Sequence, residues 1–198
     1  MERIRGFARR NWPVLIVALV VLAGRSSLAD HYVVPSGSME NTLIPGDRVM
    51  VDKTAYGLRI PFTSLVLRSG DEPSAGEVVI FDSPEDGTRL IKRVVAVGGD
   101  RVELRAGHLT VNGAPLAKEG VVGLEQIGDA QIALNLKFGG GPDITSLVIP
   151  EGHVLVLGDA RGNSRDSRYF GVVQSSQLYA RAFNIYFRSG DGFVWLPL

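Results

Sequence analysis

The sequence predicts a mainly β fold, a folded-over or closed sheet that follows one N-terminal transmembrane helix. After residue 30 the apolar runs are short and rich in Val, Ile and Leu, and Gly, Pro, Asp and Asn separate them. No stretch of ten or more residues there shows a strong 3.6-residue period. Before residue 30, an uncharged apolar run at residues 12–24 follows four Arg. These observations predict one β domain over residues 30–198.

The apolar run at residues 12–24 is the first predicted element. A membrane-spanning helix needs about 17–25 residues, and the run approaches that length if it extends to Ala29 with Arg25 at an interface. Two other interpretations are a buried soluble helix and a cleavable signal peptide. The second arises because Ser27-Leu28-Ala29 before Asp30 has the small-x-small cleavage pattern.

The charge distribution favours a retained anchor. Lys and Arg total 21, and so do Asp and Glu, yet residues 1–25 carry five Arg against one Glu. Because positive charge stays on the cytoplasmic side, we expect a cytoplasmic Arg-rich segment over residues 1–11, an anchor over residues 12–29 and an exported domain over residues 30–198. The protein would then be a single-pass protein of the inner (cytoplasmic) membrane, with its N-terminus in the cytoplasm and its β domain on the periplasmic side.

Composition excludes several classes of site. The zero net charge argues against a nucleic-acid binder, which needs surplus Lys and Arg. The absence of Cys excludes disulfides, thiolate metal sites and Cys nucleophiles. A multi-His metal site is not expected either, because the chain has only His31, His108 and His153.

Five apolar runs in the body predict strands. They lie at residues 49–51, 78–81, 90–97, 147–149 and 154–157. Asn112-Gly113 predicts a two-residue hairpin turn, and Pro115 makes the second arm of that hairpin an edge strand. Residues 118–146 carry no motif and are expected to form a looser insertion.

A Ser-rich turn at residues 35–39 offers a candidate nucleophile. Ser38 lies just after a short apolar run, and the neighbouring Gly37 allows a substrate backbone to approach closely. A Ser hydroxyl is inert without an adjacent base, and the same residues also fit an ordinary Ser/Gly turn.

Lys92 is a candidate base. Because alternate residues of a strand share a face, Lys92 lies with the apolar residues Leu90, Val94 and Ala96. Burial there lowers a Lys pKa, and a neutral amine is a competent base near pH 7–8. The alternative is an edge strand on which Lys92 and Arg93 are solvated.

The polar segment at residues 158–171 offers a third set of candidates. It is either a solvated surface loop or a polar brace, in which Asp166 pairs with an Arg and Ser164 orients a buried base. Paired carboxylates are the other class of catalyst that the composition leaves open.

Together these segments resemble the bacterial type I signal peptidase (leader peptidase) family, of the single-anchor type. The resemblance rests on four blocks that occur in order behind the Arg-flanked apolar run. They are residues 35–43 with Gly46-Asp47, residues 76–81, residues 91–95 with Gly99-Asp100, and residues 158–169.

The resemblance implies a serine endopeptidase with a Ser–Lys dyad and with no metal or other cofactor. It implies Ser38 as the nucleophile and Lys92 as the general base. The Ser38 N–H and the Ser36 hydroxyl are implied to form the oxyanion hole.

Three supporting residues are also implied by the resemblance. Ser164 would hold the Lys92 amine, while Asp166 and Arg168 would brace that region. Two positions depart from the family pattern, which commonly has Pro where Asn41 stands and Asn where Ala160 stands. These departures put the local turn geometry in doubt, but neither position carries the proton or the nucleophile.

The implied partners are membrane lipid and exported preproteins, which are cleaved after a small residue that has another small residue two positions earlier. We expect the substrate to bind extended against exposed strand edges. The residues implied to line its pockets are Tyr32, Val34, Pro35, Leu43, Val49, Leu90 and Ile91.

Two alternatives stay open. One is a self-cleaving repressor-type Ser–Lys peptidase, against which the apolar N-terminal run argues. The other is a non-catalytic membrane-anchored domain that binds peptides, against which the presence of both Ser38 and Lys92 argues.

Overall fold

The computed structural model describes Trp12, Val14, Ile16 and Val17, and then residues 29–59, 66–118, 120–121 and 123–198. The predicted cytoplasmic segment 1–11 and most of the predicted anchor 12–29 therefore lie outside the described residues. The four residues described before residue 29 are helical and exposed. Within the described part of the chain, no helix combines the length and the apolar character that crossing a bilayer requires.

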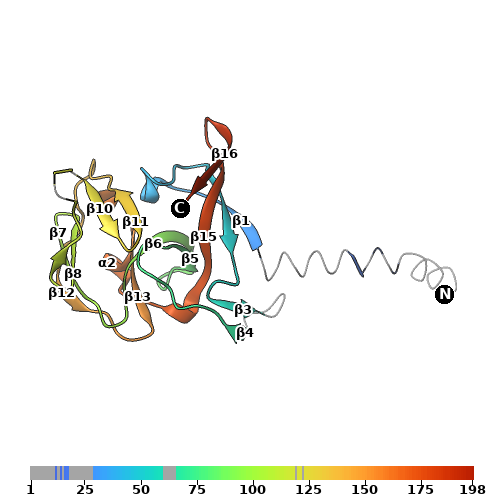
Figure 1. The fold of residues 1–198 in the computed structure, drawn as a ribbon, viewed down its shortest axis with the longest axis horizontal. Helices are drawn as coiled ribbons and strands as arrows, with labels where there is room; N and C mark the ends of the chain where they lie inside the picture. Colours follow the sequence, from blue (N-terminus) through green and yellow to red (C-terminus); the bar gives the residue numbers. More distant parts are fainter. Residues whose placement is uncertain are drawn as a thin grey trace.

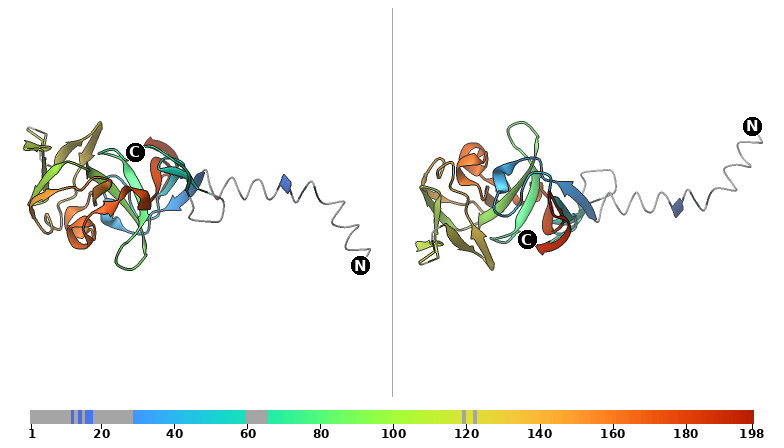
Figure 2. Two further views of the ribbon diagram at one scale, coloured as in Figure 1. Left: turned by 90° about the horizontal axis from the view of Figure 1, so that it is seen from below. Right: turned by 90° about the horizontal axis from the view of Figure 1, so that it is seen from above.

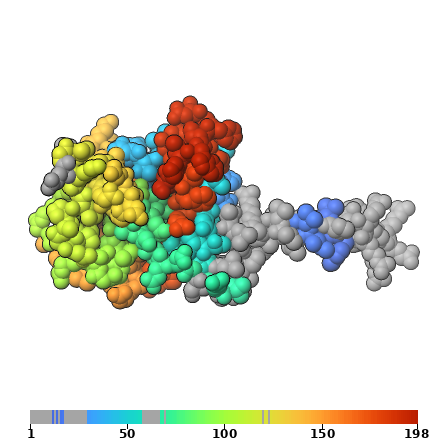
Figure 3. All heavy atoms as spheres, in the orientation of Figure 1, coloured from blue at the N-terminus to red at the C-terminus, as the bar shows by residue number. Residues whose placement is uncertain are grey.

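Antiparallel strands dominate the described chain, as the sequence predicts (Figure 1). The main sheet runs in the order β1 (Ala29–Val33), β2 (Arg48–Asp52), β15 (Leu178–Arg188), β5 (Val78–Asp82), β6 (Arg89–Val97), β13 (His153–Leu157) and β14 (Val173–Gln174). The last strand, β16 (Gly192–Pro197), pairs with β15 and projects from the surface of the domain in Figure 3.

The main sheet is bent rather than closed. Register shifts interrupt the pairing of β15 with β2 and with β5, and that of β13 with β6, and such bulges bend a sheet. Within the described residues no pairing joins β1 to β14, so the closed form of the prediction is not observed.

A second, smaller sheet lies at the end of the domain opposite β1 in Figures 1 and 2. Its order is β12 (Ile144–Val148), β7 (Arg101–Arg105), β8 (His108–Val111) and β9 (Ala114–Pro115). The predicted hairpin turn is confirmed, since Asn112 and Gly113 have φ values of 52° and 79° between β8 and β9. Pro115 lies on the edge strand, as predicted.

The remaining elements are short. Two further hairpins pair β3 (Gly57–Arg59) with β4 (Val66–Ser69) and β10 (Leu124–Ile127) with β11 (Ala130–Ala133). The short helices are η1 (Gly37–Met39), η2 (Arg161–Asn163), α2 (Ser167–Phe170) and η3 (Ser175–Gln177). Element η1 connects β1 to β2, and η2 and α2 connect β13 to β14.

The expectation of a loose insertion at residues 118–146 is wrong. That stretch contains β10 and β11 and the start of β12. Ile127 and Ile132 are almost fully buried, and they pack in one cluster with Leu104 of β7 and Leu109 of β8. The strands are only four residues long, too short for their alternation to stand out in the sequence.

Strand β6 contributes to all three hydrophobic clusters of the domain. Ile91 belongs to the first, Val95 and Ala96 to the second, and Val94 to the third. The strand is therefore buried on both faces and is fixed by packing on each side. Lys92 lies in the middle of this rigid support.

Candidate active site

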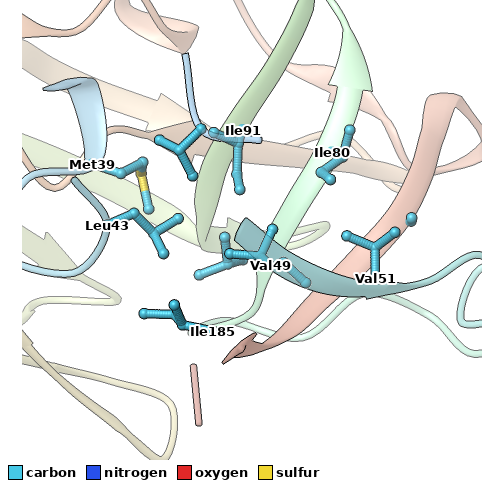
Figure 4. Close-up of a cluster of buried hydrophobic side chains, with 11 residues drawn as sticks. Met39, Leu43, Val49, Val51, Ile80, Ile91 and Ile185 are labelled. Carbon is cyan, nitrogen blue, oxygen red and sulfur yellow. The ribbon is translucent and has the colours of Figure 1, made fainter. Parts of the chain in front are cut away.

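Residues 35–43, which carry Ser38 and are called the nucleophile turn below, follow β1 and are anchored by their apolar residues. Met39 and Leu43 are fully buried and point into the first hydrophobic cluster beside Val49 and Ile91 (Figure 4). Ser38 lies between this anchor and the surface, with 7% of its area exposed. Packing on one side of the turn thus holds the Ser38 hydroxyl at a defined place.

The structure brings Ser38 and Lys92 into contact. Lys92 Nζ donates to Ser38 Oγ at 2.7 Å and to the carbonyl of Ile91 at 3.0 Å. Lys92 is 3% exposed and β6 is an inner strand of the sheet. The alternative of an edge strand with solvated Lys92 and Arg93 is therefore wrong, because Arg93 is 1% exposed as well.

Burial lowers the pKa of Lys92 to about 8, because the ammonium loses its hydration. The carboxylates of Asp166 and Asp159 oppose this shift, and the Arg168 guanidinium adds to it. A Lys with this pKa is partly neutral near pH 8, and its amine then accepts a proton from a hydroxyl within hydrogen-bond reach.

A buried ion pair, which the sequence analysis did not predict, stands beside the dyad. Arg93 Nε and Nη2 donate to the Asp159 carboxylate at 3.0 and 2.7 Å. The Thr42 hydroxyl donates to the same carboxylate at 2.6 Å, and Arg93 Nη1 donates to the Gly76 carbonyl at 2.7 Å. These bonds join β6, the nucleophile turn and the segment after β13. The available sequence signal was the second of two adjacent cations, Lys92 and Arg93, between apolar residues of β6.

The segment at residues 158–171 is a polar brace and not a solvated loop. The side chains of Asp166 and Arg168 are fully buried, and Arg168 Nε and Nη2 each donate to the Asp166 carboxylate at 2.8 Å. Asp166 also accepts from the Gly158 N–H at 3.0 Å. Arg168 extends the brace to the carbonyls of Gly140 and Arg161, each at 2.6 Å.

Ser164 does not make the expected hydrogen bond to Lys92 in this structure. Its hydroxyl is buried and has no hydrogen-bond partner among the described residues. It nevertheless lies close to the nucleophile turn, because a Cβ at Gly158 would collide with both Ser164 Oγ and the Ser38 carbonyl. Only glycine allows these two segments to approach so closely.

The implied oxyanion donors lie on the outer side of the nucleophile turn. Ser36 is exposed, and its hydroxyl lies 3.4 Å from Ser38 Oγ. The Ser38 N–H belongs to the first turn of η1, where N–H groups have no partner inside the helix. The Ser36 hydroxyl donates to Ser38 Oγ in this structure, so it would have to turn in order to donate to an incoming carbonyl oxygen.

The seven residues implied to line the substrate pockets divide into two groups. Tyr32, Pro35 and Leu90 are exposed or half-buried. The other four are at most 2% exposed and belong to the first hydrophobic cluster, and their contact with a substrate stays a prediction. They are Val34, Leu43, Val49 and Ile91.

The two departures from the family pattern have clear structural settings. Asn41 has a φ of 80°, which Asn tolerates and which the ring of Pro forbids. The Ala160 N–H donates to the Ser38 carbonyl at 3.1 Å, a main-chain bond that any residue other than Pro supplies. Among the described residues, no group of three or more His, Cys, Asp and Glu side chains is arranged to hold a metal ion.

Comparisons with known proteins show to which family the sequence is similar. The family model for signal peptidase, peptidase S26, matches residues 9–187. A signal peptidase I of Pseudomonas aeruginosa is 32% identical over 206 residues, covering 91% of this chain and 71% of the relative. Signal peptidase I P of Bacillus subtilis subsp. natto is 31% identical over 160 residues, covering 80% of this chain and 77% of the relative.

One solved structure is also similar. It is the crystal structure of a signal peptidase I from Enterococcus faecalis V583, at 31% sequence identity and a TM-score of 0.40. The match covers 56% of this chain and 97% of that one.

Proposed function

The chain belongs to the signal peptidase family, peptidase S26, and from this premise we propose that it is a serine endopeptidase that removes signal peptides from exported preproteins with a Ser38–Lys92 dyad. The observation that carries the proposal is the 2.7 Å distance from Lys92 Nζ to Ser38 Oγ inside a buried site. A nucleophile and a base within hydrogen-bond reach are what covalent catalysis by a hydroxyl requires.

The first step is attack by Ser38. The neutral Lys92 amine takes the hydroxyl proton while Oγ bonds to the scissile carbonyl carbon. Negative charge then develops on the carbonyl oxygen, and the Ser38 N–H and the Ser36 hydroxyl donate to it. A single donor of this kind is worth about 3–4 kcal/mol of barrier.

The later steps reuse the same base. The Lys92 ammonium gives its proton to the leaving amine, and the carbon–nitrogen bond breaks to leave an ester on Ser38. Lys92, neutral again, then takes a proton from water as the water attacks the ester. The acid product leaves and Ser38 regains its proton, so the cycle needs no group that the chain does not supply.

Substrate recognition is expected at the exposed edge near the nucleophile turn. Strand β1 is the terminal strand of the main sheet, and an edge strand offers unpaired N–H and C=O groups to an extended peptide. Tyr32, Pro35 and Leu90 would contact the substrate over the buried cluster, with shallow space that selects small side chains. We further propose that residues 12–29 hold the domain at the outer face of the membrane.

Turnover of a peptide tests the proposal. The full chain in detergent micelles is incubated with a synthetic signal-sequence peptide that contains a small-x-small site, and the products are identified by mass. We expect cleavage directly after the second small residue, and none by a Ser38→Ala variant with the same circular dichroism spectrum. Cleavage by that variant, or no cleavage by the parent, would contradict the proposed function.

A further inference from the structure

Asn135 links the segment after β11 to both sides of the candidate active site. Its N–H donates to the Asp159 carbonyl at 2.9 Å, and its carbonyl accepts from the Arg161 N–H at 3.1 Å. Asn135 and Ala160 therefore form an isolated parallel β-bridge. Ala160 donates in turn to the Ser38 carbonyl at 3.1 Å, so Asn135 is one residue removed from the nucleophile.

The Asn135 side chain makes a second and separate link. Its Nδ2 donates to Glu40 Oε2 at 3.1 Å, across 95 positions of sequence, while its Oδ1 accepts from the Lys137 N–H at 3.0 Å. The two bonds fix the orientation of the amide, because only one of its ends can donate. The amide is thus aimed at Glu40.

Glu40 lies against the nucleophile turn. Its N–H donates to the Gly37 carbonyl at 3.1 Å, and its carboxylate occupies the space that a Cβ at residue 37 would fill. The absence of a side chain at Gly37 therefore lets the carboxylate fold back over the turn that carries Ser38. The Asn135 amide holds the carboxylate there.

We propose that Asn135 is a positioning residue for Ser38, and this inference rests on the proposed function. Its main chain aligns Ala160 with the Ser38 carbonyl, and its side chain holds the Glu40 carboxylate on the Gly37 side of the turn. The two contacts restrain η1 at two places, the Ser38 carbonyl and the Gly37 side of the turn. A displacement of about 1 Å at a catalytic group can lower the rate by about 10²-fold, so a restraint on η1 acts on kcat.

A change of polarity tests the side-chain link. Asn135→Asp keeps the main-chain bonds and the acceptor for the Lys137 N–H, but it sets a carboxylate against the Glu40 carboxylate. We expect kcat to fall about tenfold with KM changed by less than about twofold, because orientation is lost rather than binding. Adding Glu40→Gln returns a donor to the pair with its direction reversed, and we expect kcat to recover to within about threefold of the parent.

A matched control exists in the second sheet. The Asn112 amide donates to the Asp100 carboxylate at 2.8 Å in the same manner, at the exposed turn between β8 and β9. Asn112→Asp introduces the same charge repulsion away from the site. We expect its kcat to stay within about twofold of the parent.

All variants are measured as full chains in detergent micelles with the signal-sequence peptide, and their thermal unfolding is followed by circular dichroism. A normal kcat for Asn135→Asp, or a loss that Glu40→Gln does not reverse, would overturn the inference. Equal losses for Asn135→Asp and Asn112→Asp would also overturn it, because they would reflect general destabilisation. These outcomes presuppose that the parent cleaves the peptide, so a failure of the proposed function appears separately, in the parent.

Discussion

Raising the pH from 7 to 9 should increase kcat/KM about tenfold, because Lys92 acts as a base only when it is neutral. With a pKa of about 8, about 9% of the amine is neutral at pH 7 and about 91% at pH 9. The acidic limb of the profile then has its midpoint near pH 8. A carboxylate base would instead place the midpoint near pH 4–5.

The same titration has a consequence for stability. The Lys92 pKa of about 8 lies below the ordinary lysine value of 10.5, a difference equivalent to about 3 kcal/mol. The unfolded chain binds the extra proton between these values, so folding stability is lowest below pH 8 and rises as the pH approaches 10.5. Lys92→Met removes the buried amine, and we expect it to be inactive yet more stable than the parent at pH 7, by up to about 3 kcal/mol.

The assay compares the two proteins at two pH values. For a domain of this size, 3 kcal/mol corresponds to a Tm difference of roughly 6–12 °C, less what is lost with the hydrogen bonds to Ser38 and Ile91. We expect Lys92→Met to gain this advantage at pH 7 and to lose it by about pH 10.5, whereas Lys118→Met, at an exposed position, shows no such dependence. A Tm difference for Lys92→Met that is the same at both pH values would refute the assignment of a depressed Lys92 pKa.

Other predictions concern the oxyanion donor, a buried ion pair and the N-terminus. Ser36→Ala should lower kcat by about 10²–10³ with little change in KM, and Ser36→Thr should retain more activity because the hydroxyl remains; equal kcat values for Ser36→Ala and the parent would show that Ser36 only shapes the turn. Glu125→Gln should lower the free energy of unfolding by about 3–5 kcal/mol, because it removes the charge of the ion-pair partner that lies 3.0 Å from the fully buried Arg161; a thermal unfolding curve like that of the parent would argue against this. The intact mass of membrane-extracted protein should include residue 1, since the Ala29–Asp30 bond lies within β1; a main species that begins at Asp30 would disprove retention.

The parts of the site that sequence predicts are those with a local signal. The apolar face beside Lys92 follows from its place in a Val-rich strand, although an edge strand stayed open, and the turn at Ser38 follows from its Ser, Gly and Pro neighbours. Their contact spans 54 positions, so it came from the family resemblance and not from periodicity. The local sequence predicts only that Asp166 pairs with an Arg, the resemblance names Arg168, and the structure pairs these two residues.

The parts that sequence analysis missed depend on pairings between distant segments. Asp159 joins Arg93 and Thr42 across 66 and 117 positions, and nothing in the local pattern of any of these residues names its partners. The place of Ser164 is likewise not visible in the local sequence, because it lies where Gly158 packs against the turn that carries Ser38. Contacts between segments far apart in the sequence determine which partners these side chains have.

The segment at residues 158–161 explains why so many of these distant contacts act on one hydroxyl. The Ala160 N–H donates to the Ser38 carbonyl, and the Asp159 carboxylate accepts from Thr42 and from Arg93 of β6. The main chain of Asn135 makes hydrogen bonds with Asp159 and Arg161 of the same segment. Ser38 and Lys92 lie on separate elements, so their 2.7 Å contact persists only if both elements are fixed to a common support. Because that support contacts Ser38 and the neighbour of Lys92 rather than the exposed edge of the sheet, weakening it should lower kcat more than it raises KM.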